Sequence, residues 1–77
     1  MTEIMLFSKP GCRDCDYVKA HIPAGVKVAF LDTSTAIGMA EAAYYEVRTV
    51  PALVVDERMI IGTVNIMNKL KEISPSE

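Results

Sequence analysis

Two cysteines, Cys12 and Cys15, are the residues of this sequence whose type and spacing are best suited to chemistry. They follow a short apolar segment and open a segment with helical spacing. At a helix N-terminus the first backbone N–H groups lack intrahelical partners, and their partial positive charge stabilises a thiolate. One helical turn also brings the second sulfur beside the first. The spacing therefore predicts a dithiol that cycles with a disulfide.

Other roles for this pair fit the sequence less well. A bridge that closes a four-residue loop constrains the unfolded chain little, so it makes a poor structural staple. A closed structural zinc site needs four ligands, and the single histidine, His21, lies on the same predicted helix. In a reducing compartment the pair is expected to be catalytic, redox-sensing or metal-binding.

Length and composition indicate one small globular domain covering residues 1–77. A chain of this size buries only about 60 % of the surface that its unfolded form exposes. The apolar fraction of 51% and charged fraction of 23% are those of a folded chain. The net charge of −2, without a Lys/Arg cluster, argues against nucleic acid as a partner. Since neither a membrane span nor a signal peptide is recognisable, we expect a cytoplasmic protein with no membrane partner.

The first half of the chain predicts a strand, a helix and a second strand. Residues 4–7 form an uninterrupted apolar run, which is typical of a strand buried on both faces. After the Pro10-Gly11 turn, a helix is expected from Cys12 or Arg13 to about His21. A second strand then covers residues 26–31. Its apolar residues are Val26, Val28, Phe30 and Leu31.

The second half predicts a helix, a hairpin and a final helix. Residues 32–35 offer several N-caps for the first of these helices, and Gly38 weakens its propensity. We expect its buried face to carry Ile37, Ala40, Tyr44 and Val47. Strands over 52–55 and 59–61 flank a short turn at residues 56–58 and form an antiparallel hairpin. Gly62 provides a bend before the last helix, whose inward face is expected to carry Val64, Met67, Leu70 and Ile73.

The resulting order, β-α-β-α-β-β-α, predicts an α/β fold with a four-stranded mixed sheet flanked by helices. Two segments within this order resemble a known family. Residues 7–12, Phe-Ser-Lys-Pro-Gly-Cys, resemble the approach to the active site in glutaredoxins. Residues 49–51, Thr-Val-Pro, are similar to the cis-proline segment that glutaredoxins share with thioredoxins. The resemblance covers essentially the whole chain and implies the thioredoxin fold.

The resemblance also implies roles for particular residues. Cys12 is expected to be the exposed attacking thiol and Cys15 the more buried resolving thiol. Pro51 is expected to be cis and packed against the dithiol, and Val50 to present its backbone to an extended substrate segment. Lys9 is expected to meet a substrate carboxylate or to stabilise the thiolate, and its alternative role is that of a solvated turn lysine. Arg13 should favour the Cys12 thiolate and also contact substrate.

Two differences from the family pattern affect which reductant we expect. Arg13-Asp14 stands between the cysteines where glutaredoxins usually carry Pro-Tyr, and Asp14 should oppose the thiolate. Residues 62–65, Gly-Thr-Val-Asn, replace the glycine pair and acidic residues with which glutathione-using members hold the tripeptide. The Trp and Gly-Pro of the thioredoxin motif are absent as well.

The sequence therefore predicts a monomeric thiol–disulfide oxidoreductase that reduces protein disulfides without a cofactor. A thioredoxin-reductase-type flavoenzyme is the expected reductant. Two alternatives stay open at this stage. One is a glutathione-dependent glutaredoxin, and the other is an iron–sulfur or metal carrier that uses Cys12 as a ligand in a dimer. Arg48, just before the Thr-Val-Pro segment, either touches a bound peptide or is solvated.

Overall fold

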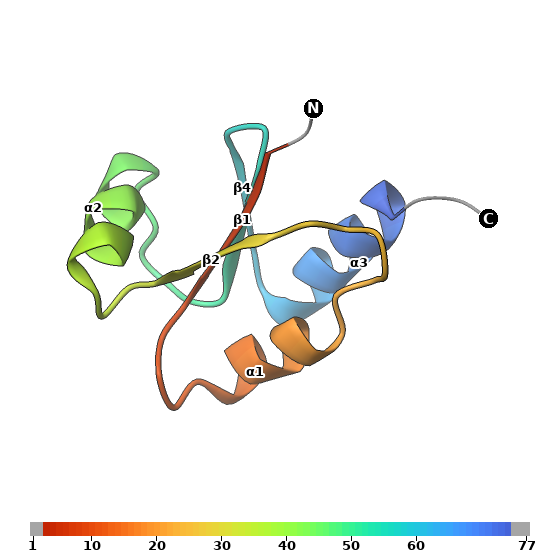
Figure 1. Cartoon of the computed structure of the whole chain (residues 1–77), viewed down its shortest axis with the longest axis horizontal. Coiled ribbons are helices and arrows are strands. Elements are labelled where there is room, and N and C mark those ends of the chain that lie inside the picture. Colours follow the sequence, from red (N-terminus) through yellow and green to blue (C-terminus); the bar gives the residue numbers. More distant parts are fainter. Residues whose placement is uncertain (1–2, 75–77) are drawn as a thin grey trace.

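The computed structural model describes residues 3–74, which form a four-stranded sheet and three helices (Figure 1). In chain order the elements are β1 (Ile4–Ser8), α1 (Arg13–Ala20), β2 (Ala29–Asp32), α2 (Ala36–Tyr44), β3 (Ala52–Val55), β4 (Arg58–Ile61) and α3 (Thr63–Ile73). The strand order across the sheet is β2-β1-β3-β4, with β1 parallel to β2 and the other pairs antiparallel. The predicted mixed sheet and element order are confirmed. Among the described residues, none of the helices is long and apolar enough to cross a bilayer.

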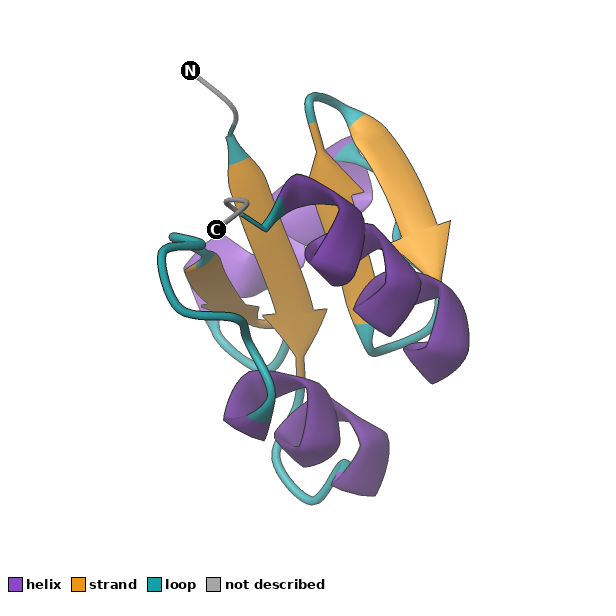
Figure 2. Cartoon of the chain, turned by 90° about the vertical axis from the view of Figure 1, so that its right-hand side faces the viewer, coloured by secondary structure: helices purple, strands orange, loops and turns teal. Residues whose placement is uncertain are grey.

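Helices cover both faces of the sheet. α1 and α3 lie together on one side and α2 lies on the other (Figures 1 and 2). Side chains alternate along the strands, so the register separates two cores. The core on the α1/α3 side contains Ile4, Leu6, Val18, Leu53, Val55, Ile66 and Leu70. The core on the α2 side contains Met5, Phe7, Ala42, Ala52 and Val54.

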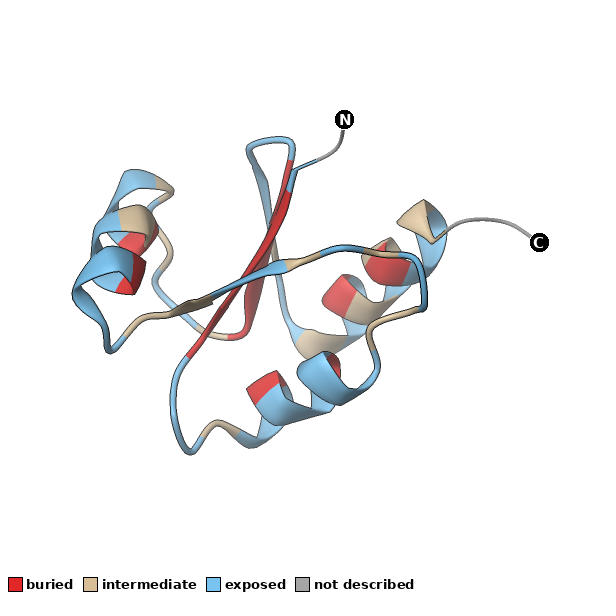
Figure 3. Cartoon of the chain, viewed as in Figure 1, coloured by how far each residue is buried: buried red, intermediate tan, exposed pale blue. Residues whose placement is uncertain are grey.

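Strand β1 is the centre of the molecule and is buried along its whole length, as Figure 3 shows. Its neighbour β3 is equally buried. Leu6 pairs with Leu53 on one face, and Phe7 pairs with Ala52 on the other. Burial of one such large side chain contributes about 1.5–3 kcal/mol to the free energy of unfolding. The rigid β1–β3 pair therefore holds the two segments that follow β1 and precede β3.

The buried face of α2 differs from the expected one. Gly38 and Ala42 face the sheet, whereas Ile37 and Tyr44 are 72% and 74% exposed. Val47 lies beyond the end of the helix at Tyr44 and packs against the α2-side core from the following segment. Because α2 is apolar around most of its circumference, the sequence allowed several different faces of the helix to be the buried one. The structure uses the stripe of small residues, which lets the helix approach the sheet closely.

Gly38 is the point of closest approach. A Cβ atom added there would overlap the backbone carbonyl of Asp32, the last residue of β2, and would lie 3.0 Å from the Thr35 hydroxyl oxygen. The backbone of α2 thus passes directly over the end of β2. Glycine is required at this position by space, since every larger residue displaces backbone rather than a flexible side chain.

Thr35 begins α2 as its N-cap, one of the positions that the sequence offered. Its hydroxyl accepts a hydrogen bond from the Gly38 N–H at 3.0 Å and donates one to the Asp32 carbonyl at 2.7 Å. We expect Thr35→Ala to lower the free energy of unfolding by about 0.5–2 kcal/mol, because both bonds are lost. Thr49→Ala is the matched control, since it makes the same change at an exposed position outside the helices and should cost less than about 0.5 kcal/mol. Urea titration of both variants measures the difference, and equal losses would contradict the assignment of the cap.

Two boundaries in the sheet also differ from expectation. β2 begins at Ala29 rather than at Val26, because its ladder with β1 starts at Met5 paired with Ala29, near the start of β1. Val26 and Val28 pack against the α1/α3-side core from the preceding loop. At the hairpin, Arg58 belongs to β4 and pairs with Val55. The turn is reduced to two residues, both with positive φ, which suits the twist of a tight hairpin.

The inward face of α3 is also shifted from the expected one. Ile66 and Leu70, four residues apart, are completely buried, whereas Val64 is 72% exposed. Gly62, with a φ of 89°, forms the bend that was expected and starts the helix at Thr63. Val64 consequently falls in a first turn that extends past the core. Met67 and Ile73 are partly buried and pack against the core as expected.

Candidate functional site

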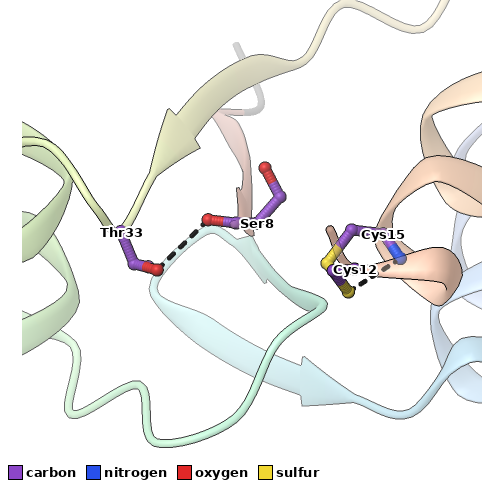
Figure 4. Close-up of a disulfide and its surroundings, with 4 residues drawn as sticks. All are labelled: Ser8, Cys12, Cys15 and Thr33. Atoms are coloured by element: carbon purple, nitrogen blue, oxygen red, sulfur yellow. Dashed lines mark hydrogen bonds between the residues drawn. A yellow bond between two sulfur atoms is a disulfide. The ribbon is translucent and has the colours of Figure 1, made fainter. Parts of the chain in front are cut away.

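The two cysteines form a disulfide at the start of α1 (Figure 4). Their Cα atoms are 5.2 Å apart. Cys12 is the N-cap residue of α1, with an extended backbone, and its Sγ accepts a hydrogen bond from the Cys15 N–H at 3.1 Å. The same sulfur that closes the disulfide thus also receives one of the unpaired N–H groups of the helix.

Burial distinguishes the two sulfur-bearing residues. Cys12 is half-buried, whereas Cys15 is completely buried within the first turn of α1. Solvent therefore reaches Cys12 but not Cys15. With the pair reduced, the Cys15 N–H and the positive end of α1 lie where a Cys12 thiolate would be stabilised.

The ends of the two parallel strands fix the loop that leads to Cys12. Thr33 donates two hydrogen bonds to the Ser8 carbonyl. One comes from its N–H at 2.8 Å, and the other comes from its hydroxyl at 3.2 Å and is drawn in Figure 4. Ser8 itself is buried, and Gly11, with a φ of 75°, completes the turn into Cys12. Thr33 was not among the residues expected from the sequence to shape this site. Its place directly after β2 was the available signal, because parallel strands end at the same edge of a sheet.

Asp32 shapes the same edge. Its carboxylate accepts hydrogen bonds from the Ser34 hydroxyl at 2.6 Å and from the Ser34 N–H at 2.8 Å. These two bonds hold the pKa of Asp32 below its ordinary value, and the Lys19 charge adds a smaller effect in the same direction. The turn from β2 to α2 is therefore fixed around an ionised carboxylate, which keeps Thr33 in place beside Ser8.

The Val50–Pro51 peptide bond is cis, as the resemblance implied. Pro51 is buried and stands immediately before β3. Because Ala52 pairs with Phe7, this segment arrives at the end of β1 from which the loop to Cys12 leaves. Residues far apart in the sequence, the cysteine loop and the cis-proline segment, thus meet at one edge of the sheet.

A groove of about 690 Å³ lies beside this edge, between α2 and the segment 47–50. We call it the Lys9 groove. The groove brings together two residues expected to bind substrate, Lys9 and Val50, and adds Arg48. Among the described residues that line it, two are cationic and none is acidic. The full lining consists of Lys9, Thr33, Met39, Ala42, Ala43, Val47, Arg48, Thr49 and Val50.

Arg13 lies in a different groove, of about 370 Å³, between α1 and α3. Its lining is Arg13, Asp14, Tyr17, Thr63, Val64, Met67 and Asn68. The residues expected to bind substrate are therefore distributed between two grooves rather than gathered in one. His21 caps the far end of α1, where its Nδ1 donates to the Tyr17 carbonyl at 2.7 Å and its ring stacks on Tyr17. Within residues 3–74, no three His, Cys, Asp or Glu side chains are grouped so that they could hold a metal ion.

Comparisons with known proteins agree with this geometry. The family model described as Glutaredoxin matches residues 4–60. The solved structure of the thioredoxin-like protein BC3987 superimposes with a TM-score of 0.66 at 20% sequence identity, covering 88% of this chain and 99% of that protein. A thioredoxin from Thermus thermophilus gives a TM-score of 0.68 at 15% identity, covering 94% of this chain and 72% of the other. Both likenesses show the thioredoxin fold. None of the curated proteins matches the sequence.

Proposed function

This chain belongs to the glutaredoxin family, and from that premise we propose that it is a dithiol oxidoreductase that reduces protein disulfides. The observation that carries the proposal is the asymmetry of the cysteine pair. A half-buried Cys12 caps a helix N-terminus, and a completely buried Cys15 lies within bonding reach of it. That arrangement suits one thiol to attack and the other to resolve.

The proposed reaction is two successive thiol–disulfide exchanges. The Cys12 thiolate attacks one sulfur of the substrate disulfide, whose S–S bond breaks and whose other sulfur leaves as a thiolate and takes up a proton. Cys15 then loses its proton and attacks Cys12 Sγ, which releases the second substrate thiol. Two electrons and two protons pass to the substrate, and the Cys12–Cys15 disulfide remains. The exchange itself needs no cofactor.

The segment before β3 is the proposed place for the substrate chain. Val50 lines the Lys9 groove and precedes the cis bond, so its backbone is available to an extended peptide. Pro51 fixes the direction of that backbone at the edge of the sheet. Arg13 is proposed to contact the substrate from the second groove, the one between α1 and α3.

Lys9 and Arg48 give the groove a preference for negative charge. We expect Lys9→Ala and Arg48→Ala each to lower kcat/KM about two- to fivefold for a disulfide peptide that carries carboxylates near its cysteines, which is the range of one solvent-exposed ion pair. A neutral peptide should show a smaller loss. Lys27→Ala, which changes an exposed lysine outside the groove, serves as the matched control. Equal effects on the acidic and neutral peptides would contradict the preference.

We propose a thioredoxin-reductase-type flavoenzyme as the reductant, in preference to glutathione. Glutathione-using members hold the amino group of the tripeptide with acidic residues after the last strand. In this chain the first turn of α3 carries no acidic residue. The amide of Asn65, which stands in that turn, is already used in a hydrogen bond to the Ile61 carbonyl at 3.1 Å.

One experiment distinguishes the two reductants. Reduction of insulin is followed as NADPH oxidation, once with thioredoxin reductase and once with glutathione plus glutathione reductase. The proposal predicts turnover with thioredoxin reductase and little above background with glutathione. Turnover with glutathione alone would contradict the assigned reductant but leave the dithiol chemistry standing. Absence of turnover in both systems would contradict the proposed function.

A further inference from the structure

The outer face of α2 is apolar and uncovered. It consists of Ala36, Ile37, Met39, Ala40, Ala43 and Tyr44. Met39 is 58% exposed, and Ile37 and Tyr44 are more exposed still. Within the nine residues of α2, only Glu41 is charged. Helices of this composition are normally buried on all sides, yet Figure 3 shows α2 exposed on the side away from the sheet.

This face is continuous with the Lys9 groove. Met39 and Ala43 belong to both, since they line the groove and stand on the exposed side of the helix. Lys9 and Val50 form the part of the groove proposed to receive a substrate segment. A molecule bound at Cys12 and extending along the groove would therefore continue onto the outer face of α2.

We propose that the outer face of α2 binds the protein that carries the substrate disulfide. The partner's matching surface is apolar and is bordered by carboxylates. This inference rests on the proposed function and adds the recognition surface. An exposed apolar helix face is best covered by an apolar surface of the partner. Lys9 and Arg48 at the border of this face favour acidic groups on that partner. A molecule the size of a tripeptide is too small to cover both the groove and a nine-residue helix.

A second copy of this chain is a poorer occupant. A twofold contact between two such faces would bring four positive charges, Lys9 and Arg48 of each copy, to the interface and few carboxylates to pair with them. Within α2 itself, Glu41 is the one residue with a negative charge. The charge pattern thus favours a different, acidic protein.

The test compares a large and a small disulfide under single-turnover conditions. The variant Ile37→Gln/Ala40→Gln/Tyr44→Gln, which leaves the lining of the Lys9 groove unchanged, is prepared in the reduced form and mixed with insulin or with hydroxyethyl disulfide. These positions are exposed and glutamine favours helix, so circular dichroism should show an intact fold. Phe30→Gln, an exposed position on β2 outside both grooves, is the matched control.

We expect the rate with insulin to fall by about tenfold in the triple variant, as for loss of interface anchors. The rate with hydroxyethyl disulfide should stay within about twofold of the unmodified protein, because a small disulfide needs only Cys12 and the groove. An undiminished rate with insulin, or equal losses with both disulfides, would overturn the docking proposal. A dimer in sedimentation that the triple variant dissociates would assign the face to a second copy instead. If the unmodified protein reduced neither disulfide, the proposed function itself would fail.

Discussion

Cys12→Ser is expected to abolish reduction of every disulfide tested, lowering the rate by roughly three orders of magnitude or more, as for loss of a catalytic nucleophile. The reason is geometric. Cys12 is the half-buried member of the pair and caps α1, and the remaining Cys15 is completely buried within the helix. A serine hydroxyl does not replace a thiolate as the nucleophile in this exchange. The measurement is insulin reduction at a fixed protein concentration.

Cys15→Ser provides the matched comparison. It should still react once through Cys12 and then stop, because the resolving thiol is missing. A mixed disulfide between the variant and its substrate should accumulate. Intact mass spectrometry should show it as an increase by the mass of one bound substrate chain, which dithiothreitol removes. If Cys12→Ser formed the trapped species and Cys15→Ser did not, the assigned roles would be reversed.

Gly38→Ala is expected to destabilise the protein, although alanine is the better helix former. Propensity alone predicts a gain of about 1 kcal/mol. The new Cβ, however, overlaps the Asp32 carbonyl, which is backbone and cannot move without displacing the end of β2. Such overpacking costs typically about 1–3 kcal/mol. The net loss is therefore expected to be up to about 2 kcal/mol, and each kcal/mol lowers Tm by about 4–8 °C.

Ala40→Gly controls for propensity in the same helix. Ala40 is exposed, so its replacement changes helix preference without altering a close contact, and it should cost about 1 kcal/mol. The two substitutions are opposite in chemistry, yet both should lower Tm. A higher Tm for Gly38→Ala would show that α2 does not pass over β2 as closely as described. It would also contradict the explanation that α2 buries its small residues, Gly38 and Ala42, because it packs closely on β2.

The elements buried on both faces were the most predictable from sequence. An uninterrupted apolar run over residues 4–7 and the β-branched run over 52–55 are confirmed as the central strands β1 and β3. The bounds of α1 were also confirmed, because the turn before Cys12 and the Pro23-Gly25 signal beyond its end are local features. The cis bond at Pro51 followed from the family resemblance, since the residues around it do not fix the isomer by themselves.

The orientation of α2 was not predictable in the same way. Periodicity selects a buried face only when polar residues mark the other one, and α2 offers apolar residues in nearly every direction. The expected stripe used the largest side chains, Ile37 and Tyr44, whereas the structure buries Gly38 and Ala42. Close packing against the end of β2 determines which face of α2 is buried, and this contact is a tertiary one. The same helix therefore holds both the main error of the sequence interpretation and the proposed docking surface.

The candidate site was predicted in part, for a related reason. Cys12, Cys15 and Pro51 belong to recognisable motifs, and the structure brings their segments to one edge of the sheet. The separation of Lys9 from Arg13 into two grooves depends on where α2 and α3 pack, which the sequence does not show. Thr33 contributes through a hydrogen bond to a carbonyl 25 residues away, a contact with no local pattern.

A redox titration of Cys12 and Cys15 tests the central claim most directly. The protein is equilibrated in buffers of graded potential, made from reduced and oxidised dithiothreitol at the low end of the range and from reduced and oxidised glutathione above it, then quenched by alkylation and analysed by mass spectrometry. A cycling dithiol predicts one two-electron transition, in which both cysteines lose alkylation together, at a potential within the range of about −270 to −120 mV found for related oxidoreductases. Cysteines that stay reduced throughout that range, or a single cysteine that oxidises alone, would contradict a Cys12–Cys15 redox pair.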